Sequence, residues 1–109
     1  MSIQLPIPIE RYVQIANSGT PEAASECFAP HATVYDEGQT YEGMAAIRNW
    51  MAATKKKYGH TVAPLELAEH GGQSVLKARL TGNFPGSPIT VNFSFVLADG
   101  KIHSLEIRS

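Results

Sequence analysis

The chain has 109 residues, of which 43% are hydrophobic and 17% charged, and its formal net charge is −1. These values predict one globular domain spanning residues 1–109 rather than a disordered segment. The composition argues against nucleic acid as a partner, because Lys55, Lys56 and Lys57 form the only basic run. Cys27 is the single cysteine, so the chain can form no internal disulfide.

The first residues carry neither a basic start nor a long apolar run, so we expect no signal peptide, no transmembrane span and no membrane partner. A cytoplasmic location is the default expectation. A chain of this size buries only about 60–65% of its unfolded surface. An internal pocket would thin the core further, and we therefore expect a homodimer that adds stability by association.

Two helices are predicted near the start of the chain. Residues 9–17 have apolar positions at helical spacing, with Pro8 suited to the first turn and Gly19 to the end. Thr20-Pro21-Glu22 then forms an N-terminal capping pattern, which predicts a second short helix that ends before Pro30. The apolar face of this second helix would comprise Ala24, Cys27 and Phe28.

A short strand and the longest helix follow. Residues 32–36 are rich in β-branched and aromatic side chains and predict a strand, after which residues 36–39 are expected to form a loop. Residues 43–58 predict a helix that ends at Gly59. The inner face of this helix would comprise Met44, Ile47, Trp50, Met51 and Thr54.

From Thr61 onward the hydrophobic pattern has a period of two, which predicts strands at 61–69, 74–83, 89–97 and 101–108. Glycine-containing turn sequences separate these strands. Three helices and one strand followed by four strands in hairpin order predict an α+β fold. On the third of the late strands, Val91, Phe93, Phe95 and Leu97 form an apolar face while Thr90, Asn92 and Ser94 point outward.

Four segments resemble a known family. They are Arg11 to Gly19, Phe28 to Asp36, Tyr41 to Trp50 with its G-x-x-A-I-R pattern, and Leu97 to Ile102. Their order and spacing are similar to the NTF2-like superfamily, which includes SnoaL-like polyketide cyclases and ketosteroid isomerases. The resemblance implies a cystatin-like cone in which three N-terminal helices pack on a curved antiparallel sheet and enclose an apolar pocket. It also implies pairing of two copies through their sheets and no metal or organic cofactor.

The resemblance also implies two site residues. Tyr12 matches the position of the family's oxyanion-stabilising tyrosine, and Asp36 matches the position of its general base. A carboxylate in an apolar pocket becomes a stronger base because desolvation raises its pKa, and a tyrosine hydroxyl can meet an enolate oxygen as charge develops. From the residues alone, Tyr12 also fits a plain core position and Asp36 an ordinary loop acid.

One departure from the steroid isomerases concerns the second oxyanion donor, a protonated acid on a later strand. Aligning the Asp99-Gly100 hairpin with one deletion puts Phe93 at that position, and without the deletion it is Asn92, which alternation turns to the other face. With Phe93 there, half of the oxyanion hole is missing. Removing one such donor typically costs about 10²–10³ in rate, which argues against classical steroid isomerase activity.

Further side chains are predicted to line the pocket and contact a ligand, although a stripe of aromatic residues and methionines also fits a plain core. His103 belongs to this set if its face of the last strand, shared with Leu105 and Ile107, points inward; a core or surface histidine is the alternative. The predicted substrate-binding residues are Tyr35, Met44, Trp50, Met51, Phe93, Phe95 and His103.

Two functions are compatible with these features. The first is an isomerase- or cyclase-type enzyme that acts on a small, mostly apolar carbonyl compound, with Asp36 as base and Tyr12 as donor. The second is a noncatalytic module that binds a hydrophobic molecule in the pocket or uses its sheet for dimerisation. The histidines offer no metal-ligand spacing, so no metal is expected in either case.

Overall fold

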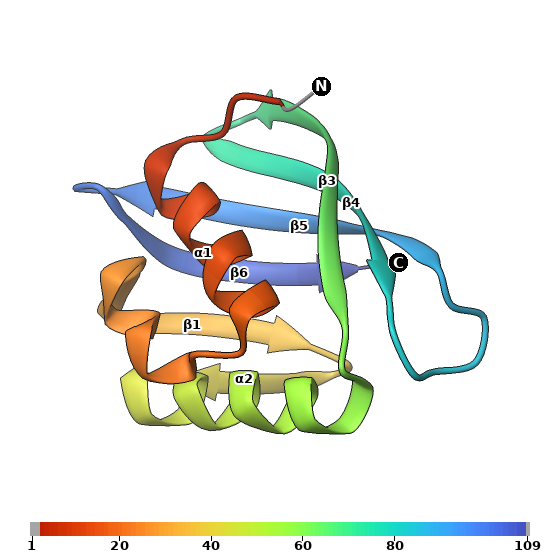
Figure 1. Ribbon diagram of the computed structural model, residues 1–109. Helices are drawn as coiled ribbons and strands as arrows, with labels where there is room; N and C mark the ends of the chain where they lie inside the picture. Colours follow the sequence, from red (N-terminus) through yellow and green to blue (C-terminus); the bar gives the residue numbers. More distant parts are fainter. Residues whose placement is uncertain (1–2, 109) are drawn as a thin grey trace.

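The computed structural model describes residues 3–108 and contains a six-stranded sheet with the strand order β2-β1-β6-β5-β4-β3 (Figure 1). All neighbouring strands are antiparallel except β1 and β6, which pair in parallel. Within the described residues no helix is long and apolar enough to cross a membrane. In chain order the elements are α1 (Ile7–Ser18), the 3₁₀-helix η1 (Pro21–Glu26), β1 (Phe28–Asp36), β2 (Gln39–Glu42), α2 (Met44–Tyr58), β3 (Thr61–His70), β4 (Gln73–Thr81), β5 (Ile89–Ala98) and β6 (Lys101–Arg108).

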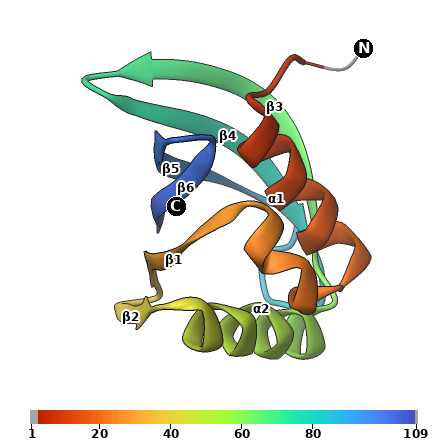
Figure 2. The ribbon, with the colours of Figure 1, turned by 90° about the vertical axis from the view of Figure 1, so that its left-hand side faces the viewer.

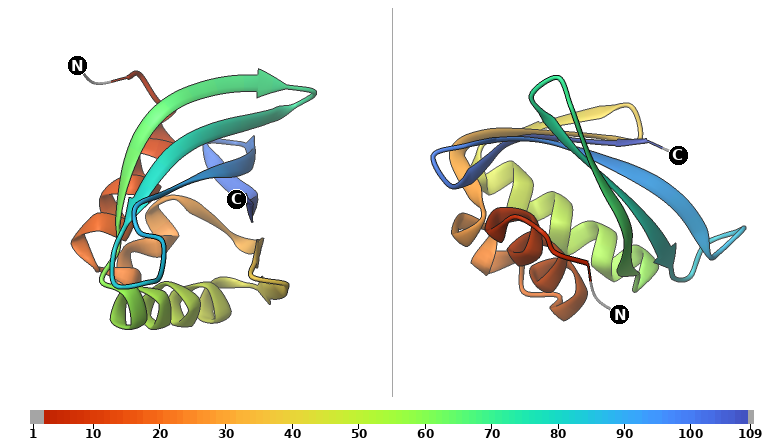
Figure 3. Two further views of the ribbon diagram at one scale, coloured as in Figure 1. Left: turned by 90° about the vertical axis from the view of Figure 1, so that its right-hand side faces the viewer. Right: turned by 90° about the horizontal axis from the view of Figure 1, so that it is seen from above.

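The sheet is strongly curved, and the helices lie on its concave side (Figure 2). The β3–β4 arm bends over α1, while α2 runs beneath the other half of the sheet and contacts β1 and β2. Seen from above, α1, η1 and α2 all cover the same face (Figure 3). This arrangement confirms the predicted cone of helices on a curved sheet.

Helix α1 ends where a left-handed residue is needed. Gly19 adopts φ 70° and donates its N–H to the carbonyl of Ile15 at 3.0 Å, which satisfies a carbonyl that the helix end leaves free. Just before it, the Asn17 amide bonds the edge strand β3: it donates to the Val62 carbonyl at 3.0 Å and accepts from the Val62 N–H at 2.7 Å. The end of α1 is thereby tied to β3.

The region between the two helices differs from expectation. The predicted second helix is a 3₁₀-helix that ends at Glu26, and β1 begins at Phe28, ahead of the strand expected at residues 32–36. Pro30 lies inside this strand rather than after a helix. It is tolerated because the pairing of β1 with β6 shifts register between Phe28 and Thr33, so no ladder hydrogen bond depends on a donor there.

The sequence predicts a loop at residues 36–39 and no strand between this loop and the next helix, so strand β2 at Gln39–Glu42 is unexpected. Instead Asp36 pairs with Gln39 across a two-residue turn in which Glu37 has φ 52° and Gly38 has φ 75°. Two positive φ values define the turn type that matches the twist of a hairpin. Asn and Asp are the usual non-glycine residues in this conformation, so a glutamate at the first position concealed the hairpin.

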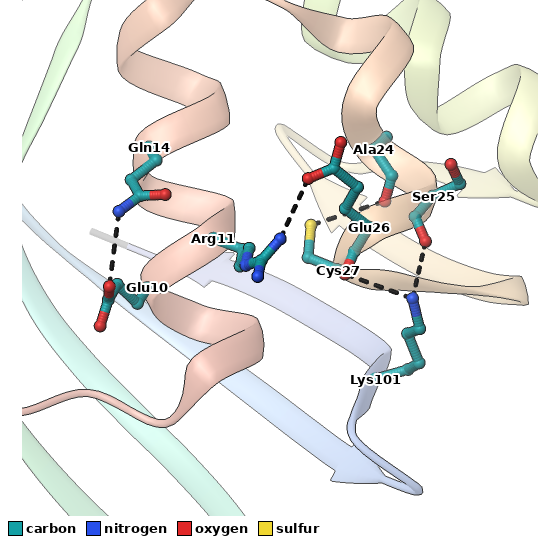
Figure 4. Close-up of polar contacts among 8 residues, drawn as sticks. All are labelled: Glu10, Arg11, Gln14, Ala24, Ser25, Glu26, Cys27 and Lys101. Atoms are coloured by element: carbon teal, nitrogen blue, oxygen red, sulfur yellow. Dashed lines mark hydrogen bonds and ion pairs between the residues drawn. The ribbon is translucent and has the colours of Figure 1, made fainter.

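Polar contacts join α1, η1 and the start of β6 (Figure 4). Arg11 pairs with Glu26 at 3.1 Å across the surface, a contact worth at most about 1 kcal/mol. The Lys101 ammonium donates to the carbonyls of Ser25 and Glu26 at 2.8 and 3.2 Å. These carbonyls are at the end of η1, where the helix itself provides no N–H donor for them. Lys101 therefore fixes this short helix against the sheet.

The core lies between the helices and the concave face of the sheet. Its centre is aromatic: the Tyr12 ring meets those of Phe28, Phe93 and Phe95 at centroid distances of 5.9, 5.9 and 5.7 Å. Burying such rings contributes more per side chain than any other part of the core. Cys27 is fully buried beside them, and burial raises the pKa of its thiol to about 12.

Candidate active site

A cavity of about 190 Å³ opens between α1, α2 and the sheet. Its wall is largely apolar and aromatic, with a few polar side chains, as is typical of small-molecule sites. An engineered cavity of about 150 Å³ is large enough to bind benzene, so this space admits a small organic molecule. Aromatic side chains from four parts of the fold reach it: Tyr12, Trp50, Tyr58, Phe84 and Phe93.

Asp36 is the acid of the inner wall. It is the last residue of β1, and alternation along the strand turns it to the concave side, opposite in direction to Tyr35. Burial is the main effect and raises the pKa of Asp36, and the nearby charge of Glu37 also raises it. Two hydrogen bonds lower this pKa, the larger effect coming from the Trp50 side chain and the smaller from the Glu37 backbone. The net direction is upward, as a base in an apolar site requires.

The hydrogen bond to Asp36 comes from α2. The indole Nε1–H of Trp50 donates to Asp36 Oδ2 at 3.0 Å, and the two side chains are both part-buried at this contact. Trp50 is only 5% exposed. The sequence pattern identified Trp50 as an apolar lining residue but gave no indication of this polar contact, because the two residues are far apart along the chain.

Tyr12 contributes a hydroxyl to the same cavity from α1. It is 3% exposed, and among the described residues its hydroxyl has no hydrogen-bond partner. Burial raises the pKa of Tyr12 strongly, and the negative charge of Asp36 raises it further. The hydroxyl therefore stays protonated at all ordinary pH values and is available as a hydrogen-bond donor.

The outer part of the cavity is more polar. The Tyr58 hydroxyl donates to Glu37 Oε1 at 3.2 Å and so links the end of α2 to the β1–β2 turn. The Tyr58 ring also meets Phe84 edge-to-face at 5.7 Å. Lys55 donates to the carbonyls of Asn17, at 3.2 Å, and of His60. These contacts hold α1, α2 and the β4–β5 loop together around the cavity.

His60 lies between α2 and β3 and also lines the cavity. Burial lowers the pKa of His60, the nearby Lys55 charge lowers it further, and the carbonyl of Thr54 raises it. Its Nδ1 atom is buried and has no hydrogen-bond partner among residues 3–108. The ordinary pKa of histidine is about 6.5, and the pKa of His60 is lower, so its imidazole is neutral at physiological pH.

Five of the nine predicted site residues meet at the cavity: Tyr12, Asp36, Trp50, Met51 and Phe93. The other four lie elsewhere. Tyr35 is 45% exposed on the outer face, because neighbours on a strand point to opposite sides. Met44 packs against the core at the start of α2, a long way along the helix from Met51. Phe95 is fully buried behind Tyr12 and supports its ring.

The position of His103 is corrected by a β-bulge. Leu97 pairs with Ile102 and Val96 with Ser104, so His103 is an extra residue opposite no partner. One extra residue reverses the alternation of the strand. Ile102 and Leu105 therefore both point inward, while His103 is exposed on the other side.

Sequence reasoning missed some of the polar lining. Tyr58 continues the helical spacing of Trp50, Met51 and Thr54, so this spacing also predicts that Tyr58 lies on the inner face of α2. His60 and Glu37 carried no comparable signal, because each follows the end of a regular element and its direction depends on the turn. Within the described part of the chain, no three His, Cys, Asp or Glu side chains gather as metal ligands.

Phe93 lines the cavity, whereas its neighbour Asn92 lies on the opposite face of β5. Asn92 pairs there with Lys77 of β4 and Arg108 of β6. The wall beside Tyr12 is thus apolar at this point, with the two rings 5.9 Å apart. Tyr12 is not accompanied by a side-chain donor from position 92 or 93.

A curved sheet with helices on its concave face and a cavity between them is the fold that this chain shares with NTF2-like and ketosteroid isomerase-like structures. Residues 9–105 match the SnoaL-like domain family. The match covers most of the chain, and the protein therefore belongs to the SnoaL-like family. No functionally curated protein matches the chain.

Solved structures share this fold. A proposed polyketide cyclase from Sinorhizobium meliloti is 39% identical, with a TM-score of 0.90 and 95% of each chain covered. A protein of Catenulispora acidiphila with a ketosteroid isomerase-like fold, solved with trimethylamine, is 19% identical with a TM-score of 0.84, covering 97% of this chain and 87% of its own. An NTF2-like protein of Cytophaga hutchinsonii is 20% identical with a TM-score of 0.75, covering 98% and 92%. The last two likenesses concern the fold alone.

Proposed function

We propose that the protein binds a small, mostly apolar carbonyl compound in its cavity and catalyses proton transfer on it, as an isomerase or a cyclase. The observation that carries this proposal is the presence of Asp36 and Tyr12 on the wall of one aromatic cavity. One is a base whose pKa burial raises, and the other is a neutral donor. Together they supply both functions that enolisation requires.

The reaction begins with the ionised Asp36 carboxylate. It takes a proton from the carbon next to the substrate carbonyl, and the electron pair of the broken C–H bond moves to form a C=C bond and an enolate oxygen. The Tyr12 hydroxyl donates a hydrogen bond to that oxygen. Because the cavity is apolar, this hydrogen bond strengthens as the negative charge develops.

Two outcomes then follow from the same enolate. In an isomerase, the protonated Asp36 returns its proton to another carbon of the conjugated system, which moves the double bond. In a cyclase, the enolate carbon attacks a second carbonyl of the same molecule and closes a ring, and the alkoxide oxygen formed from that carbonyl takes up the proton from the protonated Asp36. The related Sinorhizobium meliloti protein, a proposed polyketide cyclase at 39% identity, supports the second outcome more than the first.

A noncatalytic binding module is the second candidate. The observation that favours it is Phe93, which packs beside Tyr12 and leaves it without a second side-chain donor on β5. The loss of one oxyanion donor typically lowers kcat by about 10²–10³. A chain that uses the cavity for binding alone would have no need of that donor.

A solvent-exchange assay separates the two candidates. Small cyclic ketones and β,γ-unsaturated ketones are first screened for binding by shifts of the Trp50 indole resonance. Those that bind are incubated in D₂O, and deuterium entry next to the carbonyl is followed by ¹H NMR. The enzyme proposal predicts exchange above the buffer rate that Asp36→Asn abolishes and Tyr12→Phe reduces by about 10²–10³.

The control is Tyr35→Phe, which removes a hydroxyl from the outer face of β1 and should exchange at the unsubstituted rate. If compounds bind but none exchanges faster than in buffer, the binding module replaces the enzyme. If exchange persists in Asp36→Asn, another group is the base and the assignment of Asp36 is wrong.

A further inference from the structure

Trp50 is the only tryptophan of the chain, and the acceptor of its indole N–H is a carboxylate. The Nε1–H donates to Asp36 Oδ2 at 3.0 Å across a sequence separation of 14 residues. A buried indole N–H requires an acceptor, and backbone carbonyls or water usually provide one. Here the acceptor is the acid that faces the cavity.

The Trp50 ring is itself held in place. Tyr41 of β2 packs against it with ring centroids 6.0 Å apart and an interplanar angle of 33°. Tyr41 pairs with Val34 of β1, two residues before Asp36. The β1–β2 hairpin therefore carries both the carboxylate and the ring that packs on its donor, so the donor and the acceptor are kept in register by one small unit.

We propose that Trp50 is a positioning residue for Asp36, whose indole N–H fixes the orientation of the carboxylate toward the cavity. The inference rests on the proposed function, in which Asp36 transfers a proton. A free carboxylate rotates about its Cβ–Cγ bond, whereas one held at Oδ2 does not. Proton transfer from carbon depends on such alignment, and a misplacement of about 1 Å can cost about 10²-fold in rate.

The same hydrogen bond maintains the base in its reactive form. Burial raises the pKa of Asp36, and the Trp50 donor opposes that effect because it stabilises the charged carboxylate. Of the neighbouring charges, that of Glu37 also acts on this pKa and raises it. The other titratable or charged side chains that line a hollow together with Asp36 are Tyr12 of α1, Lys55 and Tyr58 of α2 and His60 before β3 at the cavity, and Tyr35 of β1 and Glu106 and Arg108 of β6 at a second hollow beside it.

The single tryptophan makes the contact directly observable. In ¹⁵N-labelled protein the Trp50 indole N–H gives one resonance that needs no assignment. If it donates to Asp36, its chemical shift follows the ionisation of that carboxyl as the pH is changed. In Asp36→Asn the amide oxygen still accepts the hydrogen bond but does not ionise, so this pH-dependent shift should disappear.

Trp50→Phe tests the consequence for the base. It retains an aromatic ring in the core but removes the donor, so the Asp36 pKa should rise above its value in the unsubstituted protein. Deuterium exchange into a bound ketone should fall by about 10- to 100-fold, with little change in the concentration needed for half-saturation. Tyr35→Phe, on the outer face of β1, is the matched aromatic control and should leave the pKa and the exchange rate unchanged.

An indole resonance that does not follow Asp36, or an Asp36 pKa that is unchanged in Trp50→Phe, would overturn the positioning role. Neither result affects the proposed function, which instead fails if the Asp36 pKa of the unsubstituted protein is not raised. If Trp50→Phe does not fold, the comparison of the indole titration between unsubstituted protein and Asp36→Asn decides the question without it.

Discussion

Gly82 lies directly against the backbone of Tyr58, at the point where α2 ends. A Cβ atom on Gly82 would be 2.7 Å from the Tyr58 carbonyl oxygen and 3.0 Å from the Cα of His60. The next residue, Asn83, donates its N–H to the same Tyr58 carbonyl at 2.7 Å. Tyr58 and His60 both line the cavity, so this close approach of two backbones sets part of its wall.

Gly82→Ala should therefore destabilise the fold. The atoms that a methyl group would meet belong to the backbone, which cannot rotate away as a side chain can, and overpacking of this kind costs about 1–3 kcal/mol. Urea unfolding measures the loss. Thr81→Ala at the exposed neighbouring position is the control and should cost less, and equal stability of the two variants would show that the backbones do not meet as described.

Asp36→Asn should make the protein more stable at neutral pH. The pKa of Asp36 is raised in the folded state, so between its unfolded value of about 3.9 and its folded value the folded state binds more protons than the unfolded state. Stability contributed by this group is therefore lost as the pH rises through that window. Asparagine does not ionise and can still accept the Trp50 hydrogen bond.

The measurement is urea unfolding of both proteins from pH 4 to pH 8. The stability advantage of Asp36→Asn should shrink toward the acid end, as aspartate becomes increasingly protonated in both states. Glu22→Gln, an exposed change on η1, serves as the control and should show no such trend. A variant less stable than the unsubstituted protein at pH 7 would mean that the Asp36 charge is stabilising.

We expect the protein to be a homodimer that pairs through the outer face of its sheet. On this face β5 presents the polar or small side chains of Thr90, Asn92, Ser94 and Val96, whereas the residues between them are buried on the opposite face. Stable interfaces of standard size bury about 800 Å² per partner. Sedimentation velocity at micromolar concentration should give the mass of two chains. Val96→Arg should yield monomers and Glu22→Arg on η1 should not; a monomer for the unsubstituted chain would refute the dimer.

The sequence predicted best those elements whose pattern is long and regular. Helix α2 and the four strands after Thr61 lie within about two residues of their expected bounds, because several consecutive positions support each period. Strand β2 has only four residues, too few for alternation to be distinct from a loop. Residues 20–28 carry a helical capping pattern, but only a six-residue 3₁₀-helix follows it, at Pro21–Glu26.

The site was predicted less completely for a different reason. Family resemblance identified Tyr12 and Asp36, and the helical stripe identified Trp50 and Met51. The direction of His103 depends on one unpaired residue in β6, which the alternation of side chains alone does not reveal. The contact between Trp50 and Asp36 is tertiary and requires the whole sheet to be assembled.

The pKa of the Asp36 carboxyl, followed by ¹³C NMR across pH in the unsubstituted protein, tests the central claim most directly and needs no substrate. The claim is that Asp36 is a desolvated base facing an apolar cavity. It predicts a pKa above the ordinary value of about 3.9. A pKa at or below that value would show a solvated acid, and the enzyme proposal would then give way to the binding module.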